Sequence, residues 1–160
     1  MPLLLICRPG LRFVFYLRIL QDRRLLLIHP IVHLLRFMLS RKTGIEIHPS
    51  TRIGVGFRLV HARNITINSG AVLGENVNMY KGSTIGNSGG RHNGVPRIGS
   101  HVQIGINSTV IGGINIGNDV LIAPNTLVNF DVPDHSIVIG NPAKVIRREG
   151  ATKEYVYFCE

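Results

Sequence analysis

The stretch that decides the fold, residues 98–128, reads IGSHVQ IGINST VIGGIN IGNDVL IAPNTL V when it is divided into groups of six. A bulky aliphatic residue opens each group, and glycine or alanine often follows it. A period of six is neither the 3.6 of an α-helix nor the unbroken alternation of a long strand, so the chain must turn after each short run. Three runs of six therefore make one triangular coil of eighteen residues.

The same spacing extends outward from this stretch through most of the chain. A slip of two residues between Ile65 and Ile67 and a polar interruption after Ile85 divide the series. The aliphatic positions are Ile47, Ile53, Leu59, Ile65, Ile67, Leu73, Met79, Ile85, Ile98, Ile104, Val110, Ile116, Ile122 and Val128. Stacked coils bury such a ladder, and the glycines are expected to permit the corner dihedral angles. We therefore expect an all-β body, a parallel β-helix of about five coils.

Composition divides the chain into three segments. Residues 1–42 are rich in Leu, Phe and Arg and predict a helical arm, residues 43–148 predict the β-helix domain, and residues 149–160 predict a short packing tail. Within the β-helix domain, residues 86–97 read GNSGGRHNGVPR and are too polar and glycine-rich to continue the core. They are expected to leave the coil as a loop, and such loops on a rigid scaffold commonly carry function.

The arm is strongly basic. Residues 1–42 hold eight Lys and Arg against Asp22 alone, a net charge of +7, which leaves only +2 of the total +9 for the body. A nearly neutral body with few aromatic residues argues against a nucleic-acid-binding surface. Two short helices, 10–21 and 31–42, are expected, with Pro30 as the break. The longest uncharged run of the arm, residues 25–35, is too short to cross a bilayer.

Two interpretations of the arm stay open. It is either a helical cap that packs on the body or on another subunit, or a segment that lies on an anionic membrane surface. The two cysteines, Cys7 and Cys159, lie near opposite ends of the chain and suggest neither a disulfide framework nor a thiolate metal site. A reducing compartment, the cytoplasm, is therefore expected, with the inner face of the membrane as the surface on which the arm would lie.

Four motifs carry a resemblance to a known family. They are GIEIHP at 44–49, GFRLVHA at 56–62, the interrupted IGNSGGRH at 85–92 and IGNPAK at 139–144. In these motifs the chain resembles the hexapeptide-repeat acyltransferases, and within them the serine O-acetyltransferase branch with its polysaccharide-associated relatives. The resemblance implies a left-handed coil, acetyl-CoA as acetyl donor and a homotrimer. Family members with a longer helical domain ahead of the repeats form dimers of trimers, so the short arm here favours a simple trimer.

The chemistry of acetyl transfer to an alcohol identifies a candidate base. An uncharged hydroxyl attacks a thioester poorly at neutral pH, so a group near it must accept its proton. His61 is the best candidate because an imidazole titrates near pH 6.5, close to the working pH. Glu46 lies 15 residues earlier, three short of one full coil, so its carboxylate is expected to reach the neighbouring corner and orient the ring. In the family an acid at this place, usually Asp, pairs with the histidine.

The other histidines are expected to play structural roles. His29 and His33 belong to the arm, and His101 and His135 lie in turns with no acidic partner at a telling spacing. His48, which follows Glu46 in the motif, is expected to support its corner. No cysteine or HxxxH spacing accompanies these residues, so no metal site is predicted.

The loop and the residue before His61 bear on the acceptor. Arg91 and His92 resemble the Arg-His pair that contacts the acceptor in serine acetyltransferases, although Asn93-Gly94-Val95 separates the pair from Pro96 here. The alternative is an ordinary solvated loop. Serine-specific members carry Asp directly before the catalytic histidine, where it can hold the ammonium group of serine, whereas this chain has Val60. L-Serine or a related small molecule is therefore one expected acceptor, and a sugar hydroxyl, as in a capsular or exopolysaccharide precursor, is the alternative.

The resemblance also implies a groove for coenzyme A along the later coils, where small residues let a pantetheine arm lie against the backbone. Lys144, with Arg147 and Arg148 as neighbours, is expected to meet a phosphate. The residues expected to line the groove are Asn87, Gly105, Ile106, Ala123 and Pro124. Two other classes of protein are alternatives. A non-catalytic β-helix scaffold would have no use for a paired His61 and Glu46. A γ-type carbonic anhydrase needs three zinc-ligating histidines, and the histidines of this chain do not fall at such positions.

Overall fold

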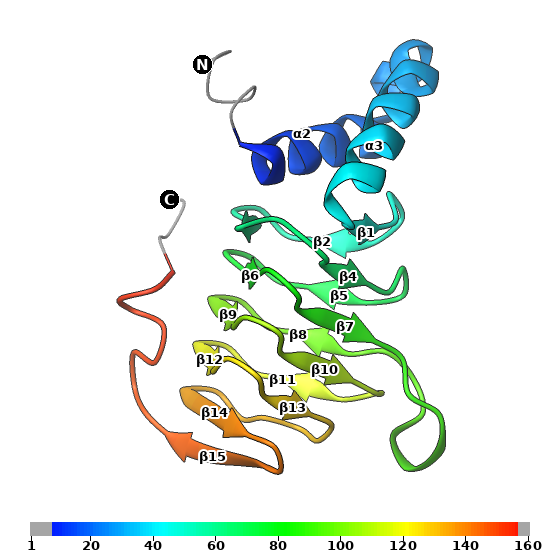
Figure 1. The fold of residues 1–160 in the computed structure, drawn as a ribbon. Coiled ribbons are helices and arrows are strands. Elements are labelled where there is room, and N and C mark those ends of the chain that lie inside the picture. Colours follow the sequence, from blue (N-terminus) through cyan, green and yellow to red (C-terminus); the bar gives the residue numbers. More distant parts are fainter. Residues whose placement is uncertain (1–7, 157–160) are drawn as a thin grey trace.

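The computed structural model describes residues 8–156, except for the side chain of Arg91. Two helices, α2 (Pro9–Gln21) and α3 (His29–Thr43), are joined by the short 3-10 helix η1 (Arg23–Ile28). They lie at one end of a three-sided stack of short strands (Figure 1). Within the described residues, no helix is both long enough and apolar enough to cross a membrane.

The strands form three sheets that the chain visits in turn, here called sheets A, B and C. Sheet A consists of β1 (Glu46–Ile47), β4 (Thr66–Ile67), β7 (Thr84–Gly86), β10 (Thr109–Ile111) and β13 (Leu127–Val128). Sheet B consists of β2 (Arg52–Ile53), β5 (Val72–Leu73), β8 (Arg97–Ile98) and β11 (Asn115–Ile116). Sheet C consists of β3 (Arg58–Val60), β6 (Asn78–Tyr80), β9 (Val102–Ile104), β12 (Val120–Ile122), β14 (Ser136–Gly140) and β15 (Ala143–Arg147). The predicted left-handed parallel β-helix of about five coils is confirmed.

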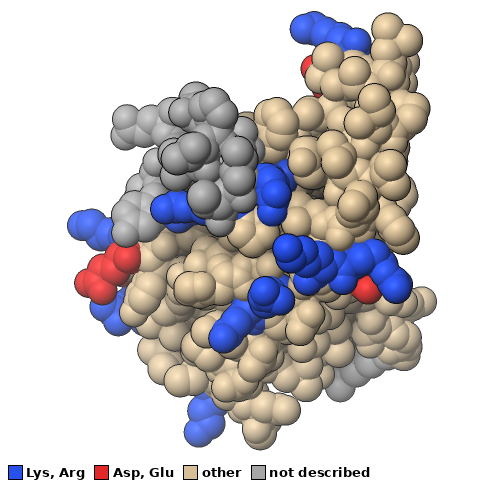
Figure 2. Space-filling model, turned by 45° about the horizontal axis from the view of Figure 1, so that its top comes forward, with Lys and Arg blue, Asp and Glu red and all other residues tan. Residues whose placement is uncertain are grey.

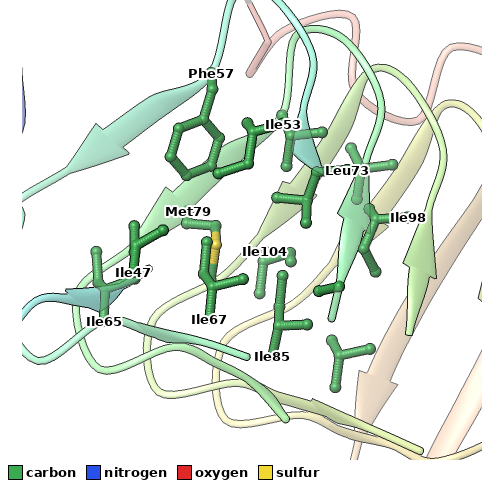
Figure 3. Packing of buried hydrophobic residues seen from close by; sticks show 14 of the residues in the cluster. Ile47, Ile53, Phe57, Ile65, Ile67, Leu73, Met79, Ile85, Ile98 and Ile104 are labelled. Atoms are coloured by element: carbon green, nitrogen blue, oxygen red, sulfur yellow. The ribbon is translucent and has the colours of Figure 1, made fainter. Parts of the chain in front are cut away.

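The aliphatic ladder fills the inside of the stack. Ile47 pairs with Ile67 and Ile67 with Ile85, so equivalent side chains of successive coils lie directly over one another. Figure 3 shows the side chains of all three sheets converging on this interior. Of the fourteen ladder positions only Leu59 is not fully buried, and it packs against the core. Each coil therefore contributes one side chain per sheet to a continuous apolar column.

The glycines that follow the aliphatic residues serve a different purpose from the one expected. Gly54, Gly74, Gly99, Gly105 and Gly117 do not have left-handed backbone angles. A Cβ on Gly99 would lie 2.6 Å from the carbonyl oxygen of Gly117, and the other four would meet the next coil as closely. The corner dihedral prediction is therefore wrong for these positions, which are small because adjacent coils approach closely. The left-handed corner positions without glycine are His61, Asn64, Asn76, His101, Asn107, Asp119, Asn125 and His135.

Helix α2 closes the first coil. Phe13 and Leu17 are completely buried, and Gly10 lies so close to β3 that a Cβ there would be 2.5 Å from the carbonyl oxygen of Leu59. The guanidinium of Arg18 donates to the carbonyl oxygens of Ile53, at 2.7 Å, and of Gly54. Desolvation lowers the pKa of Arg18 from its usual value. The cap interpretation of the arm therefore holds for α2, which covers the open end of the coil.

The two expected helices are present, but Pro30 does not separate them. It lies in the first turn of α3, where its missing N–H costs no hydrogen bond. The chain changes direction earlier, at Asp22, whose carboxylate accepts a hydrogen bond from the backbone N–H of Arg24. The intervening η1 was not predicted from the sequence.

Residues 87–96 leave the coil between β7 and β8, and Figure 1 shows this loop projecting from the stack. Ser88 and Gly94 form a small antiparallel bridge at its base. The N–H of Gly113 donates to the carbonyl oxygen of His92 at 2.8 Å. A Cβ on Gly112 would lie 2.8 Å from that same oxygen, so the adjacent glycines of the next coil are what allow the loop to return against it.

Candidate active site

The corner between sheets C and A, here called the C–A corner, stacks several predicted site residues in one column. Backbone hydrogen bonds join its successive coils: Gly82 donates to Arg63, Asn107 to Lys81 and Asn125 to Ile106. His61 lies at this corner in the first coil, because it follows β3 and precedes β4.

The C–A corner is irregular at His61. Eight residues separate Leu59 from Ile67, whereas six separate the equivalent ladder residues Met79 and Ile85 in the next coil. The slip in the sequence period is thus a two-residue insertion at the candidate base. His61 has a left-handed backbone with φ of 51°, as His101 and His135 do at other corners, so the insertion is what distinguishes this corner. Such local irregularity on a regular scaffold is typical of functional sites.

A cavity of about 820 Å³ lies between α2 and this part of the β-helix. His61, Val60 and Ile106 all line it, so the predicted base and one predicted coenzyme A residue share one space. The side chain of His61 is exposed, and its ring nitrogens make no hydrogen bond to any residue in the part of the chain that the structure describes. Its ring centroid lies 6.5 Å from that of Tyr80. The imidazole is therefore accessible to a ligand in the cavity.

The walls of this cavity are basic. Four cationic residues line it: Arg8, Arg58, Arg63 and Lys81. Among its described lining residues there is no Asp or Glu. Val60 pairs in register with Tyr80 directly beside His61, so no carboxylate stands at the place where serine-specific relatives are expected to carry one. The described lining of the cavity therefore offers no counter-charge for an ammonium group.

Glu46 begins β1, the sheet A strand next to the one that follows the His61 corner, whereas His48 comes after β1, at the corner between sheets A and B. Glu46 is exposed at the start of β1, in register with Thr66, which follows His61 round the corner. The structure records no ion pair between Glu46 and His61 among the residues it describes. His48 bonds through Nδ1 to the hydroxyl of Ser50 at 2.7 Å, which agrees with the structural role expected of it.

The remaining predicted residues fall on two other parts of the stack. Asn87 and the exposed His92 belong to the loop at the corner between sheets A and B, across sheet A from His61. The side chain of Arg91 lies outside the described part of the structure. Lys144 is exposed on β15, which runs antiparallel to β14 at the far end of the β-helix. A single chain therefore does not bring the loop residues to the cavity.

The residues at the C–A corner that are expected to line the coenzyme A groove follow His61 in later coils. Gly105 and Ile106 lie two coils beyond it, and Ala123 and Pro124 lie three coils beyond it. The N–H groups of Gly105 and Ala123 already donate to Ile122 and Val138 within the stack. Gly105 and Ala123 are thus small residues that offer no free N–H group, and the surface that they form with Ile106 and Pro124 continues from the cavity that contains His61.

A second polar cluster, which sequence reasoning missed, lies at the corner between sheets B and C. His135 Nδ1 is 2.9 Å from Asp119 Oδ2 and 3.2 Å from Glu149 Oε2. The same Asp119 carboxylate accepts hydrogen bonds from the N–H of Ala151 and from the N–H and hydroxyl of Thr152. The expectation that His135 has no acidic partner is wrong. The cluster anchors the C-terminal segment against the β-helix.

The pKa values of this cluster follow from its contacts. The hydrogen bond to Asp119 raises the pKa of His135 above its usual value. Burial tends to raise the pKa of Asp119, but the hydrogen bonds from His135, Thr152 and Ala151 together outweigh it and lower that pKa. Among the described residues, no group of three or more His, Cys, Asp and Glu side chains is placed to hold a metal ion, and this cluster is no exception.

The sequence matches known proteins over most of its length. The family model for the bacterial transferase hexapeptide (six repeats) matches residues 96–129. The serine acetyltransferase of Helicobacter pylori is 34% identical over 153 residues, which are 91% of this chain and 85% of that protein. Serine acetyltransferase 2 of Arabidopsis thaliana is 39% identical over 76% of this chain, but the match spans only 41% of the plant protein. The chain thus spans less than half the length of that relative.

Solved structures give the same result. The crystal structure of the Neisseria gonorrhoeae serine acetyltransferase superposes with a TM-score of 0.76 at 32% identity, covering 94% of this chain and 60% of that one. The structure of that enzyme in complex with serine superposes with a TM-score of 0.74 at 34% identity, over 89% of this chain and 58% of that one. The similarity thus extends beyond the repeats to most of the described chain.

Proposed function

Because this chain belongs to the serine acetyltransferase family of hexapeptide-repeat proteins, we propose that it is an acetyl-CoA-dependent O-acetyltransferase with His61 as general base. The observation that carries this proposal is the position of His61: an accessible imidazole, on an inserted left-handed corner, in the large cavity between α2 and the β-helix. A pure scaffold would have no need of that insertion.

The proposed reaction requires one proton to move twice. Acetyl-CoA supplies an acetyl group activated as a thioester. His61 would take the proton of the acceptor hydroxyl as the oxygen attacks the carbonyl carbon, and would return it to the sulfur as the C–S bond breaks. A positioned general base of this kind contributes about 10²- to 10⁴-fold in rate.

Glu46 is proposed as the residue that orients the His61 ring, as the family motif implies. It begins β1 immediately after the first C–A corner, and Thr66, its partner in register, follows the His61 corner. Both the carboxylate and the imidazole are exposed, and we propose that a bound acceptor brings them together. An orienting carboxylate fixes the tautomer of an imidazole and stabilises its protonated form.

The donor is proposed to run along the C–A corner from His61 toward the later coils, over Ile106 and Ala123. Lys144, at the end of β15 nearer this corner, would meet its phosphates. Arg147 and Arg148, which the sequence suggested as its neighbours, lie at the opposite end of β15, where the guanidinium of Arg147 donates to the carbonyl oxygen of Asp134 and the N–H of Arg148 donates to that of His135. Asn87, Arg91 and His92 lie across sheet A from this groove in the same chain, so they can contribute only from a neighbouring copy. This division of the residues between two corners supports a homotrimer, in which three grooves lie between adjacent β-helices.

The acceptor is proposed to be L-serine or a related small molecule, since relatives across the family are serine acetyltransferases. One specific observation favours a second candidate, the hydroxyl of a sugar or polysaccharide precursor. Val60 stands beside His61, and no acidic residue lines the described part of the cavity, so the ammonium group of serine has no counter-charge there. We place either reaction in the cytoplasm, where acetyl-CoA and reduced cysteines occur.

The test is thiol release from acetyl-CoA by the purified chain, with L-serine beside free and nucleotide-linked sugars. Thiol release with any of these acceptors supports the transferase, and its absence with all of them overturns it. The variant Val60→Asp separates the two acceptors. A charge-assisted hydrogen bond contributes about 1.5 to 3 kcal/mol, so kcat/KM for serine should rise at least tenfold if Val60 has removed the ammonium site. Val60→Asn, which adds a polar group without the charge, is the matched control.

A further inference from the structure

Helix α3 has a buried apolar side and, next to it, an exposed apolar side. Val32 and Leu39 are buried against the rest of the protein. The exposed side carries four residues of α3 at the i, i+3, i+4 and i+7 spacing of one helix face, and one residue of η1 precedes them; these five are here called the outer stripe. They are Leu27, Ile31, Leu34, Leu35 and Met38.

The outer stripe is a contiguous set of highly exposed apolar side chains rather than a few isolated surface leucines. Leu27 is 97% exposed, Ile31 64% and Met38 60%, and Leu26 beside them is 62% exposed. A helix that is apolar on all sides is normally buried, and a contiguous exposed apolar patch normally marks an interaction surface. Within the described chain nothing covers this face.

Basic residues stand at both ends of the outer stripe. Arg23 and Arg24 lie at its tip, next to η1, and Arg41 and Lys42 lie at its base, next to the β-helix; all four are exposed. No Asp or Glu occurs between residues 23 and 45. Figure 2 shows a projecting part of the molecule with few charged side chains, with Lys or Arg beside an acidic side chain near its tip and further Lys and Arg across its base.

The outer stripe is also placed to reach a surface. Helix α3 and η1 project beyond the first coil, at the end of the molecule opposite β14 and β15 (Figure 1). The turn that joins α2 to α3 therefore lies at the far end of the molecule from the last coil. This turn contains the exposed pair Leu26 and Leu27.

We propose that the outer stripe docks on an anionic lipid surface, with the apolar side chains entering the headgroup boundary and the four cations contacting lipid phosphates. Interfacial helices combine buried apolar area with attraction to anionic lipids in this way. A second copy of the chain is a poorer occupant. Two outer stripes that met face to face would bring Arg23, Arg24, Arg41 and Lys42 of both copies together, and the segment holds no acid to pair with them. The contacts of a cyclic trimer join different faces of neighbouring copies, and the light-scattering experiment below tests that arrangement.

The chain contains no tryptophan, so one introduced indole reports on docking without background. Leu27→Trp places it at the tip, and Ile146→Trp, at a half-exposed site on β15, is the matched control at the other end of the molecule. With vesicles of phosphatidylcholine and phosphatidylglycerol, the emission of Leu27→Trp should shift to the blue and that of Ile146→Trp should not. Neither should shift with phosphatidylcholine alone. An unshifted Leu27→Trp on the mixed vesicles overturns the proposal.

A flotation assay with the same two vesicle types separates the contributions. The triple variant Leu26→Ser, Leu27→Ser and Ile31→Ser should lose binding about tenfold or more, while Arg23→Gln with Arg24→Gln should weaken it and flatten its salt dependence. Light scattering tests the other occupant: if the triple variant lowers the oligomeric mass in solution and the wild type ignores both vesicle types, the stripe is an interface between copies. The assay uses no acetyl transfer, so its outcome is independent of the proposed activity.

Discussion

The ring of His61 leans against the ring of Tyr80, with 6.5 Å between centroids and 54° between planes. Tyr80 belongs to the next coil and pairs in register with Val60. A residue in a regular strand, Tyr80, therefore contacts the side chain of His61, which lies at the irregular corner. This contact restricts the imidazole on the side facing the β-helix and leaves its other side open to the cavity.

We predict that Tyr80→Ala lowers kcat by as much as about tenfold, since aromatic pairs contribute about 0.5 to 1.5 kcal/mol beyond simple burial. Tyr80→Phe keeps the ring and should keep the rate. Steady-state kinetics should assign the loss to kcat, with the KM for acetyl-CoA unchanged. A Tyr80→Ala protein that melts like the wild type and turns over at the wild-type rate would show that the contact does not position His61.

The glycines at the coil corners give a matched pair of substitutions. Gly99→Ala would place a methyl group 2.6 Å from the Gly117 carbonyl oxygen, whereas Gly86→Ala would meet only the Ile111 side chain at 3.4 Å. We expect Gly99→Ala to lower the free energy of unfolding by about 1 to 3 kcal/mol and Gly86→Ala to change it little. Chemical denaturation measures both, and equal effects would rule out the steric explanation.

The aliphatic ladder was predictable because a six-residue period can be satisfied only by a chain that turns three times per coil. The reason for the adjacent glycines was not predictable. The sequence shows only that residue 99 is a glycine. The stacked coils show that the glycine is needed because the Gly117 backbone lies close to it, and not because of its dihedral angles. Pro30 was misplaced for a similar reason, since proline both ends helices and begins them.

The candidate site was predictable in part. The motif at 56–62 and the chemistry of acetyl transfer singled out His61, which the structure places at the cavity. The two-residue slip beside it was interpreted only as a break in the repeat. The His135–Asp119 pair was not predicted because the two residues are 16 apart, whereas a regular coil has eighteen residues. The last coil, from Ile122 to Val138, is two residues shorter than that, and this shortening brings the pair together. The relation of Glu46 to His61 depends on rotamers and on bound acceptor, which no sequence period encodes.

The His135–Asp119 pair predicts a pH dependence of stability. The pKa of His135 is raised in the folded state, so its contribution is complete below the unfolded value of about 6.5 and is lost as the pH rises through the folded value. The pKa of Asp119 is lowered, so its contribution is lost only when the pH falls through a value below the usual one.

Melting temperatures between pH 5.5 and 9 would test this dependence. The wild type should lose stability over that range relative to His135→Gln, while the arm variant His33→Gln should follow the wild type. Parallel curves for the wild type and His135→Gln would mean that the pair does not contribute.

The central claim, that His61 is the general base, is tested most directly by its replacement with alanine, measured with the acceptor that turns over fastest in the thiol-release panel. We predict that kcat falls by about 10²-fold or more in His61→Ala, while the melting temperature and the KM for acetyl-CoA stay near those of the wild type. His33→Ala should retain full activity. A folded His61→Ala protein with near wild-type turnover would contradict the account.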